Sequence, residues 1–275
     1  MTDFIQFAHE RGLIINSIVR GKWARVPTVT HPTSRNGAYF FEDTYAHVQN
    51  WSIMDSPETW QDNQPRTPFE QEALRKRIET SHRLQLAERN RVREEAARKA
   101  RWILTQCALE KHAYLDSHGM KDDLGLVWHR GEDNLLCVPM KVNDAVCGVQ
   151  LINRAGDKKF LTGQQCKNAS FTIGGGRHNI YCEGYATAKA IYAACAAFRL
   201  SVKVHACFSA GNLLNVAKNG FVIADNDASG TGERVTKESG LPYFMPPTQG
   251  DDFCDMWMSM GSLKSGMILQ KLLLS

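Results

Sequence analysis

Two aspartates, Asp225 and Asp227, stand one residue apart directly after the apolar run FVIA. Small residues and two glycines follow them in the stretch ASGTG. Carboxylates at the end of a hydrophobic segment need hydrogen bonds or a cation to offset the cost of their burial. Three interpretations are therefore open for this stretch: a calcium loop, an aspartate-stabilised turn, or half of a magnesium site.

The calcium interpretation fails on spacing. An EF-hand loop carries acidic residues at its first and third positions, a glycine at the sixth and a glutamate at the twelfth. Counted from Asp225, the third residue is Asp227 and the sixth is Gly230, but the twelfth is Thr236. An EF-hand loop also follows a helix, whereas GFVIA has the apolar pattern of a strand. For the aspartate pair taken alone, a simple turn remains open.

Other acids stand at comparable positions. Glu183 directly follows the strand-like NIYC, and a third acidic group follows the last strand-like segment, at Asp251, Asp252 and Asp255. In a parallel α/β sheet, the carboxyl ends of the strands share one edge, where ligands bind. Carboxylates gathered there repel one another unless a cation lies between them, and oxygen ligands suit Mg²⁺ or Mn²⁺. Glu183 therefore favours the metal interpretation over the turn.

The elements that must position these acids alternate along the chain. Strand patterns cover residues 179–182, 201–208, 220–225 and 241–246, and helical patterns cover 184–198 and 210–218. Strands that alternate with helices of this kind indicate βαβ units and a parallel sheet. We therefore expect an α/β domain over residues 176–260.

Four further segments complete the predicted organisation. Residues 1–66 read as a small α+β unit, with a helix over 2–13, strands near 17–28 and 36–43, and Trp51 and Trp60 in loops. A charged helix over 69–108 forms a linker assigned to residues 67–110, either solvated or with a basic face toward phosphates. Residues 111–175 form a smaller α+β subdomain with a hairpin around NDA. A short apolar helix over 261–275 packs on the core or docks a partner.

Composition sets limits on location and partners. The 275 residues carry a net charge of +4, which permits a nucleic-acid partner without requiring one. The chain contains no apolar run of about 18 residues and begins with a polar segment, so we expect neither a membrane span nor a signal peptide. The eight cysteines are scattered, as in a reducing compartment, and none precedes Cys107. We therefore expect a cytoplasmic protein without a thiolate zinc site in its first unit.

The motifs together resemble a known family. YCEGYATA followed by IADNDASGTG resembles the Toprim domain, in which Glu-Gly ends one strand and Asp-x-Asp ends a later one. EGYATA, FSAGNL and DDFCDMW most resemble the primases of phages and plasmids. Residues 135–163 are similar to the segment that precedes the Toprim domain in primase cores, where a hairpin leads to a basic K-[YF]-L element. The resemblance covers about residues 100–258.

The resemblance implies a function for each group. It implies that Glu183, Asp225 and Asp227 are the catalytic metal acids, with Asp252 as a further metal ligand. It also places basic residues against template or nucleotide phosphates, at Lys141, Lys158 and Lys159, of which we favour Lys159. The implied reaction is RNA primer synthesis from NTPs on single-stranded DNA during phage or plasmid replication in a bacterial cell. The implied cofactor is Mg²⁺ or Mn²⁺, without zinc.

Basic residues in the first unit and the lack of a P-loop in the sequence give further expectations about partners. Basic residues interleaved with Trp23 and Tyr39 either contact single-stranded template or are merely solvated, namely Arg20, Lys22, Arg25 and Arg35. The sequence contains no P-loop, so a separate replicative helicase is expected as a partner. Two alternatives to a primase stay open. One is a metal-dependent Toprim nuclease or nicking enzyme, and the other is a non-catalytic nucleic-acid-binding protein of replication or anti-defence.

Overall fold

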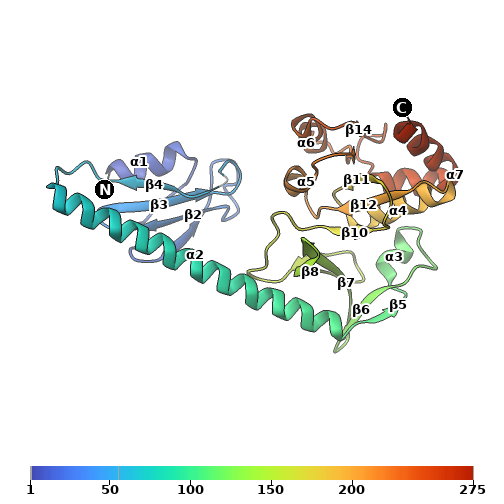
Figure 1. Cartoon of the computed structure of the whole chain (residues 1–275), viewed down its shortest axis with the longest axis horizontal. Coiled ribbons are helices and arrows are strands. Elements are labelled where there is room, and N and C mark those ends of the chain that lie inside the picture. Colours follow the sequence, from blue (N-terminus) through green and yellow to red (C-terminus); the bar gives the residue numbers. More distant parts are fainter. Residues whose placement is uncertain (1, 55, 275) are drawn as a thin grey trace. The chain divides into compact units, whose positions relative to one another are not determined.

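The structure is a computed structural model that describes residues 2–54 and 56–274, with only the backbone of Thr2 and Leu274. Met1 and Ser275, the outer ends of the first and last predicted segments, lie outside this range. The chain forms two compact units, Met1–Leu86 and Ala87–Ser275, and their division falls inside the long helix predicted as a linker. Figure 1 shows the order of the elements. No helix in the described residues is long and apolar enough to cross a membrane.

The first unit contains a four-stranded antiparallel sheet with α1 (Thr2–Glu10) packed on one face. The strands, in spatial order, are β1 (Trp23–Val26), β2 (Gly37–Phe41), β3 (Tyr45–Asn50) and β4 (Glu58–Gln61). Phe4 of α1 is fully buried, as the apolar face of the helix predicts. Trp60 lies in β4 and packs against Phe4, so its prediction as a loop residue is wrong. β4 is too short for its alternation to be recognised in the sequence.

The charged helix is confirmed as α2 (Pro68–Thr105). Thr67 and Glu70 form a capping box at its start, because the Thr67 backbone N–H donates to Glu70 Oε2 (2.8 Å) and the Glu70 backbone N–H donates to Thr67 Oγ1 (3.3 Å). Arg91 pairs with acids one turn away on either side, as a solvated helix face predicts. The buried side chains of α2 all lie near its C-terminal end, at Ala96, Ala97, Ala100 and Ile103.

The second unit begins with a five-stranded antiparallel sheet, onto which the end of α2 packs. Its strands are β5 (Ala108–Glu110), β6 (Gly125–Arg130), β7 (Asp133–Val142), β8 (Ala145–Ile152) and β9 (Lys158–Phe160), with α3 (Ala113–Ser117) after β5. The predicted hairpin is confirmed as β7 and β8. Asn143 (φ 47°) and Asp144 (φ 64°) join these strands in the left-handed region, as a tight hairpin turn requires.

The predicted alternation of strands and helices is confirmed in the third sheet. Its strands, in the spatial order β10-β12-β11-β13-β14, are β10 (Phe171–Ile173), β12 (Val202–Ala206), β11 (His178–Cys182), β13 (Phe221–Ile223) and β14 (Tyr243–Phe244). β10 pairs antiparallel with β12, and the other four strands are parallel. The helices are α4 (Tyr185–Ala197), α5 (Ala210–Val216), α6 (Thr231–Ser239) and α7 (Phe253–Leu274). The chain is therefore a mixed α/β protein with several sheets.

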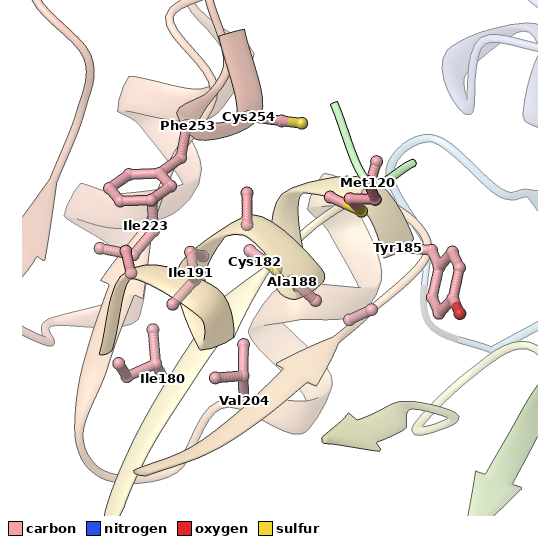
Figure 2. Close-up of a cluster of buried hydrophobic side chains, with 14 of the residues drawn as sticks. Met120, Ile180, Cys182, Tyr185, Ala188, Ile191, Val204, Ile223, Phe253 and Cys254 are labelled. Carbon is pink, nitrogen blue, oxygen red and sulfur yellow. The ribbon is translucent and has the colours of Figure 1, made fainter. Parts of the chain in front are cut away.

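The third sheet buries side chains on both faces, as a parallel sheet requires. Figure 2 shows the larger cluster, in which Ile180, Val204 and Ile223 of the strands pack with Ile191 of α4 and Phe253 of α7. The opposite face is covered by α5 and α6, and its cluster consists of Tyr181, Cys207, Leu213, Ala217, Val222 and Val235. Helices on both faces leave the carboxyl edge of the sheet as the place where polar side chains gather.

The C-terminal segment is longer than predicted. The sequence predicts a separate helix over 261–275, whereas α7 starts at Phe253 and is interrupted at Gly261 (φ 79°). Ser265 and Leu269 are buried, so one face of the second half packs on the core. Met267 is 50% exposed on the other side.

Candidate active site at the carboxyl edge of the parallel sheet

Neighbouring strands bring the predicted acids to one edge. β11 lies between β12 and β13 and runs parallel to both, with Ile180 opposite Phe221 and Tyr181 opposite Val222. Glu183 directly follows β11, and Asp225 lies two residues beyond the end of β13. The two acids, distant in the sequence, therefore leave the sheet side by side.

Asp225 lies at the centre of the acidic group. Its Oδ1 atom is buried and has no hydrogen-bond partner in the described residues. Burial raises the pKa of this carboxyl from 3.8 to about 7. The negative charges of Asp252, Glu183 and Asp227 add to the rise, and Lys158 opposes it. Lys158 is thus the one positive charge that acts on Asp225 among the described residues, and it forms no salt bridge with this carboxyl group that would offset its burial.

Asp227 is stabilised in its ionised form by the loop that follows it. The Ser229 hydroxyl donates to Oδ1 (2.5 Å), the Thr231 backbone N–H donates to the same atom (3.2 Å), and the Gly232 N–H donates to Oδ2 (3.4 Å). The Ser229 hydrogen bond is the main reason that the pKa of Asp227 is lowered. The start of α6 therefore holds this carboxylate negative, which also suits cation binding.

Gly232 has a specific role beside these two aspartates. A side chain at this position would collide with the Asp225 carbonyl oxygen. Gly230, which precedes α6, has a left-handed backbone (φ 68°) that glycine adopts without strain. The glycines after the aspartates therefore allow α6 to approach the Asp225 backbone closely.

Glu183 lies between the start of α5 and a lysine. Burial raises the pKa of Glu183. Lys158 opposes this rise, as does a hydrogen bond from the Ala210 backbone at the first residue of α5. The carbonyl oxygen of Glu183 accepts a hydrogen bond from the Phe208 N–H (2.8 Å), which ties β11 to the end of β12. At this edge, Glu183 is a carboxylate suited to hold a metal or to accept a proton.

Asp252 is close to the group but has another role as well. Its Oδ2 accepts a hydrogen bond from the Thr187 hydroxyl (2.8 Å), and its Oδ1 accepts one from the Asp255 N–H (2.9 Å). Asp255 in turn accepts a hydrogen bond from the Asp252 N–H (3.0 Å). This reciprocal pair caps the start of α7. The carbonyl oxygen of Asp251 accepts a hydrogen bond from the Asn226 N–H (3.0 Å).

The three lysines that are predicted to contact phosphates occupy different places in the structure. In β9, Lys158 lies opposite the buried Ile152, whereas Lys159 lies opposite Leu151, on the face toward α2. Residues paired across antiparallel strands face the same side, so Lys158 and Lys159 point to opposite faces. Lys158 lowers the pKa of both Asp225 and Glu183 and is the lysine that the structure brings to the acids.

Lys141 lies away from the acidic group. Its backbone forms a bridge with Ser170, in which each N–H donates to the other carbonyl (3.0 and 2.9 Å). Its side chain lines a groove together with Lys203 and His205. Lys141 and Lys158 are therefore separate candidates for phosphate contact.

The basic residues of the first unit are at its surface. Arg20 pairs with Asp43 (3.0 Å), and Lys22 is exposed. The Arg25 guanidinium lies 4.0 Å from the centre of the Trp51 ring and donates to the Arg35 carbonyl oxygen (3.0 and 2.7 Å).

The aromatic residues near these arginines differ in exposure. Trp23 is 38% exposed, but Tyr39 is buried and its hydroxyl donates to the Ser17 carbonyl oxygen (2.8 Å). The interpretation of Tyr39 as a stacking surface is wrong, because Tyr39 lies on the face of β2 that packs against α1.

Sequence reasoning missed a buried residue that organises the loops around the site. Asn212 of α5 donates to the carbonyl oxygens of Ala169 (2.7 Å) and Cys207 (2.8 Å), and its Oδ1 accepts from the Asn168 N–H (2.8 Å). It joins the segment before β10, the end of β12 and α5. The polar residue inside the otherwise apolar helix pattern AGNLL is the signal that could have identified it.

The acidic group fits a divalent cation. All its donors are oxygen atoms, which suit Mg²⁺ or Mn²⁺, and Asp225 Oδ1 is an unpartnered buried oxygen. Across residues 2–54 and 56–274, no three His, Cys, Asp or Glu side chains already converge as a set of metal ligands. Asp225, Asp227 and Glu183 are the residues that would hold such a cation, because the charges of Glu183 and Asp227 raise the pKa of Asp225 and the charge of Asp227 raises the pKa of Glu183.

No protein-family model and no curated protein matches this chain. Its function must therefore be inferred from the site residues and their surroundings.

Proposed function

We propose that this chain is a Toprim-type primase that joins ribonucleotides on single-stranded DNA with Mg²⁺ or Mn²⁺. The observation that carries the proposal is the partly buried Asp225, with one unpartnered oxygen, among other acids at the edge of a parallel sheet. Four parallel strands with helices on both faces support the Toprim-type interpretation. The antiparallel sheet that precedes them in the same unit supports the resemblance to a primase core.

Each residue of the site has a role in this proposal. Asp225 and Asp227 would hold the metal, with Glu183 as a further ligand or as the group that accepts the proton of the attacking 3′-hydroxyl. When bound, the metal would lower the pKa of that hydroxyl and stabilise the leaving pyrophosphate. Lys158, which faces the acids, would bind a phosphate of the nucleotide. The new bond joins the 3′-oxygen to the α-phosphorus, and the bond to the pyrophosphate breaks.

Asp252 would be a further ligand of the metal rather than one of its main ligands. Both of its carboxylate oxygens accept hydrogen bonds, from Thr187 and from the N–H of Asp255. Its charge nevertheless raises the pKa of Asp225. Asp252 would therefore be a further ligand of the metal, bound through a second lone pair of a carboxylate oxygen or in exchange for one of these hydrogen bonds.

A primer-synthesis assay tests the proposal. The full chain is incubated with mixed-sequence single-stranded DNA, labelled NTPs, and Mg²⁺ or Mn²⁺, and the products are separated by size. We expect short RNA products from the wild type and none from Asp225→Asn or Asp227→Asn. Glu238→Gln is the matched control, because Glu238 is an exposed acid of α6 that pairs with Arg234 (3.0 Å).

Three results would contradict the proposal in different ways. Full activity of Asp225→Asn would exclude the metal acids as catalytic groups. Cleavage of labelled DNA without NTP incorporation would identify the nuclease alternative. If the wild type neither incorporates NTPs nor cuts DNA but still binds it, the chain is a non-catalytic nucleic-acid-binding protein.

A further inference from the structure

An aromatic side chain lies beside Lys158 on the same face of β9. Phe160 lies opposite Gln150 in the ladder, and Lys158 lies opposite Ile152. Residues two apart in a strand face the same side and are separated by about 6.6 Å along it. Phe160 therefore faces the same side as the lysine that acts on Asp225 and Glu183.

The ring of Phe160 is available to a ligand. Its side chain is 43% exposed, and β9 is the edge strand of its sheet. The ring contacts Phe208 edge to face, with the ring centres 6.4 Å apart and an interplanar angle of 84°. An edge-to-face pair leaves a face of a ring open for stacking.

Phe208 is held in an unusual conformation next to Glu183. Its φ of 67° lies in the left-handed region, which is rare for a bulky side chain. Its N–H donates to the Glu183 carbonyl oxygen (2.8 Å), and the next residue, Ser209, caps α5. Strain of this kind persists where the surrounding structure enforces it, and it is common at functional sites. The backbone of Phe208 is thus held beside Glu183, and the Phe208 ring contacts Phe160.

We propose that Phe160 and Phe208 form a stacking subsite for a nucleobase whose phosphate is bound near Lys158. This inference rests on the proposed function, because it takes a nucleotide as the ligand of the acidic edge. Two features carry it. The aromatic pair, of which Phe160 is exposed and Phe208 is half-buried, adjoins the acids through the hydrogen bond from the Phe208 N–H to the Glu183 carbonyl oxygen. Phe160 also lies on the same face of β9 as Lys158, two residues away. Stacking on an aromatic ring accepts any base, which suits copying of a mixed template.

A binding experiment tests the subsite without catalysis. Fluorescence anisotropy measures the affinity of the full chain for a labelled oligo(dT) and for an abasic strand of equal length and charge, in Ca²⁺ and without NTPs. We expect the wild type to prefer oligo(dT). In Phe160→Ala and Phe160→Leu, the affinity for oligo(dT) should fall by about 5- to 100-fold, whereas the affinity for the abasic strand should stay the same. Phe160→Tyr should retain the preference for oligo(dT).

A second arm identifies the source of the base. Direct titration with a fluorescent ATP analogue, with the same variants, reports stacking of a free nucleotide. A loss confined to the strand places the base of DNA or primer on Phe160, and a loss confined to the analogue places the incoming nucleotide there. If Phe160→Ala and Phe160→Leu bind both ligands like the wild type, the subsite does not exist.

Different results would contradict the primase assignment and the stacking subsite. NTP incorporation by the wild type, combined with an unchanged base preference in Phe160→Ala, would remove only the stacking subsite. Loss of base preference in Phe160→Ala, combined with no incorporation by the wild type, would remove only the primase assignment. Phe160→Leu guards against misfolding, because it retains an apolar side chain at an exposed edge position, and thermal melting of each variant checks the fold.

Discussion

Replacing Asp225 with asparagine should stabilise the metal-free protein at neutral and alkaline pH. The pKa of Asp225 is raised from 3.8 to about 7, so the folded protein holds a proton that the unfolded chain releases between these values. The stability of the wild type should therefore fall as the pH rises from about 4 to about 7. At about 1.4 kcal/mol per pH unit, the full effect is about 4 kcal/mol. Solvent screening at this partly exposed site reduces the expected gain to about 2 kcal/mol.

Urea unfolding in EDTA at pH 5 and pH 8 measures this effect. We expect Asp225→Asn to unfold at higher urea than the wild type at pH 8, with a smaller difference at pH 5. Added Mg²⁺ or Mn²⁺ should stabilise the wild type at pH 8 and should have little effect on the variant. Equal midpoints for the two proteins at pH 8 in EDTA would refute the conclusion that the ionised Asp225 carboxylate destabilises the metal-free protein.

Asp227→Asn is the matched control, and its expected effect on stability at pH 8 has the opposite sign. The pKa of Asp227 is lowered by its hydrogen bonds from Ser229, Thr231 and Gly232. Its ionised form therefore contributes stability above its unfolded pKa, and this contribution is lost as the pH falls through the folded pKa. Asp227→Asn should destabilise the metal-free protein at pH 8, where Asp225→Asn stabilises it.

Three further predictions concern the surroundings of the acids. Gly232→Ala should destabilise the protein by about 1–3 kcal/mol in urea unfolding and abolish metal-induced stabilisation, because the new methyl group meets the Asp225 carbonyl. Lys158→Ala should lower NTP incorporation by about tenfold or more, whereas Lys159→Ala should change it little; equal losses would contradict the assignment of faces in β9. Asn212→Ala should cost about 2 kcal/mol of unfolding free energy, because two buried carbonyls lose their donor; an unchanged urea midpoint would contradict this role.

Much of the site could be predicted because the acids follow strands of one parallel sheet. Strand ends can be recognised from apolar runs, and parallel topology places their carboxyl ends together. Glu183, Asp225 and Asp227 were identified in this way, and the structure brings them to one edge. The mixed α/β class followed from the same alternation of strands and helices.

Features that depend on contacts distant in the sequence could not be predicted. In a three-residue strand such as β9, the sequence does not show which lysine faces the acids, because the face depends on the pairing with β8. The burial of Tyr39 likewise depends on α1 packing against β2. The sequence does not predict helix α6, because its pattern is short and polar and its position depends on Gly232 and on the hydrogen bonds to Asp227.

Asp252 belongs both to the acidic edge of the sheet and to the cap of α7, so it links the site to the C-terminal helix. The carboxylate that accepts the Thr187 hydroxyl and the Asp255 N–H lies in the electrostatic field of Asp225. If a cation attracts Asp252 away from one of these donors, the first turn of α7 loses part of its cap and its amides exchange faster with solvent. Local opening at Phe253–Met256, more than 20 residues along the chain from Asp225, would then report occupancy of the acidic edge without any substrate.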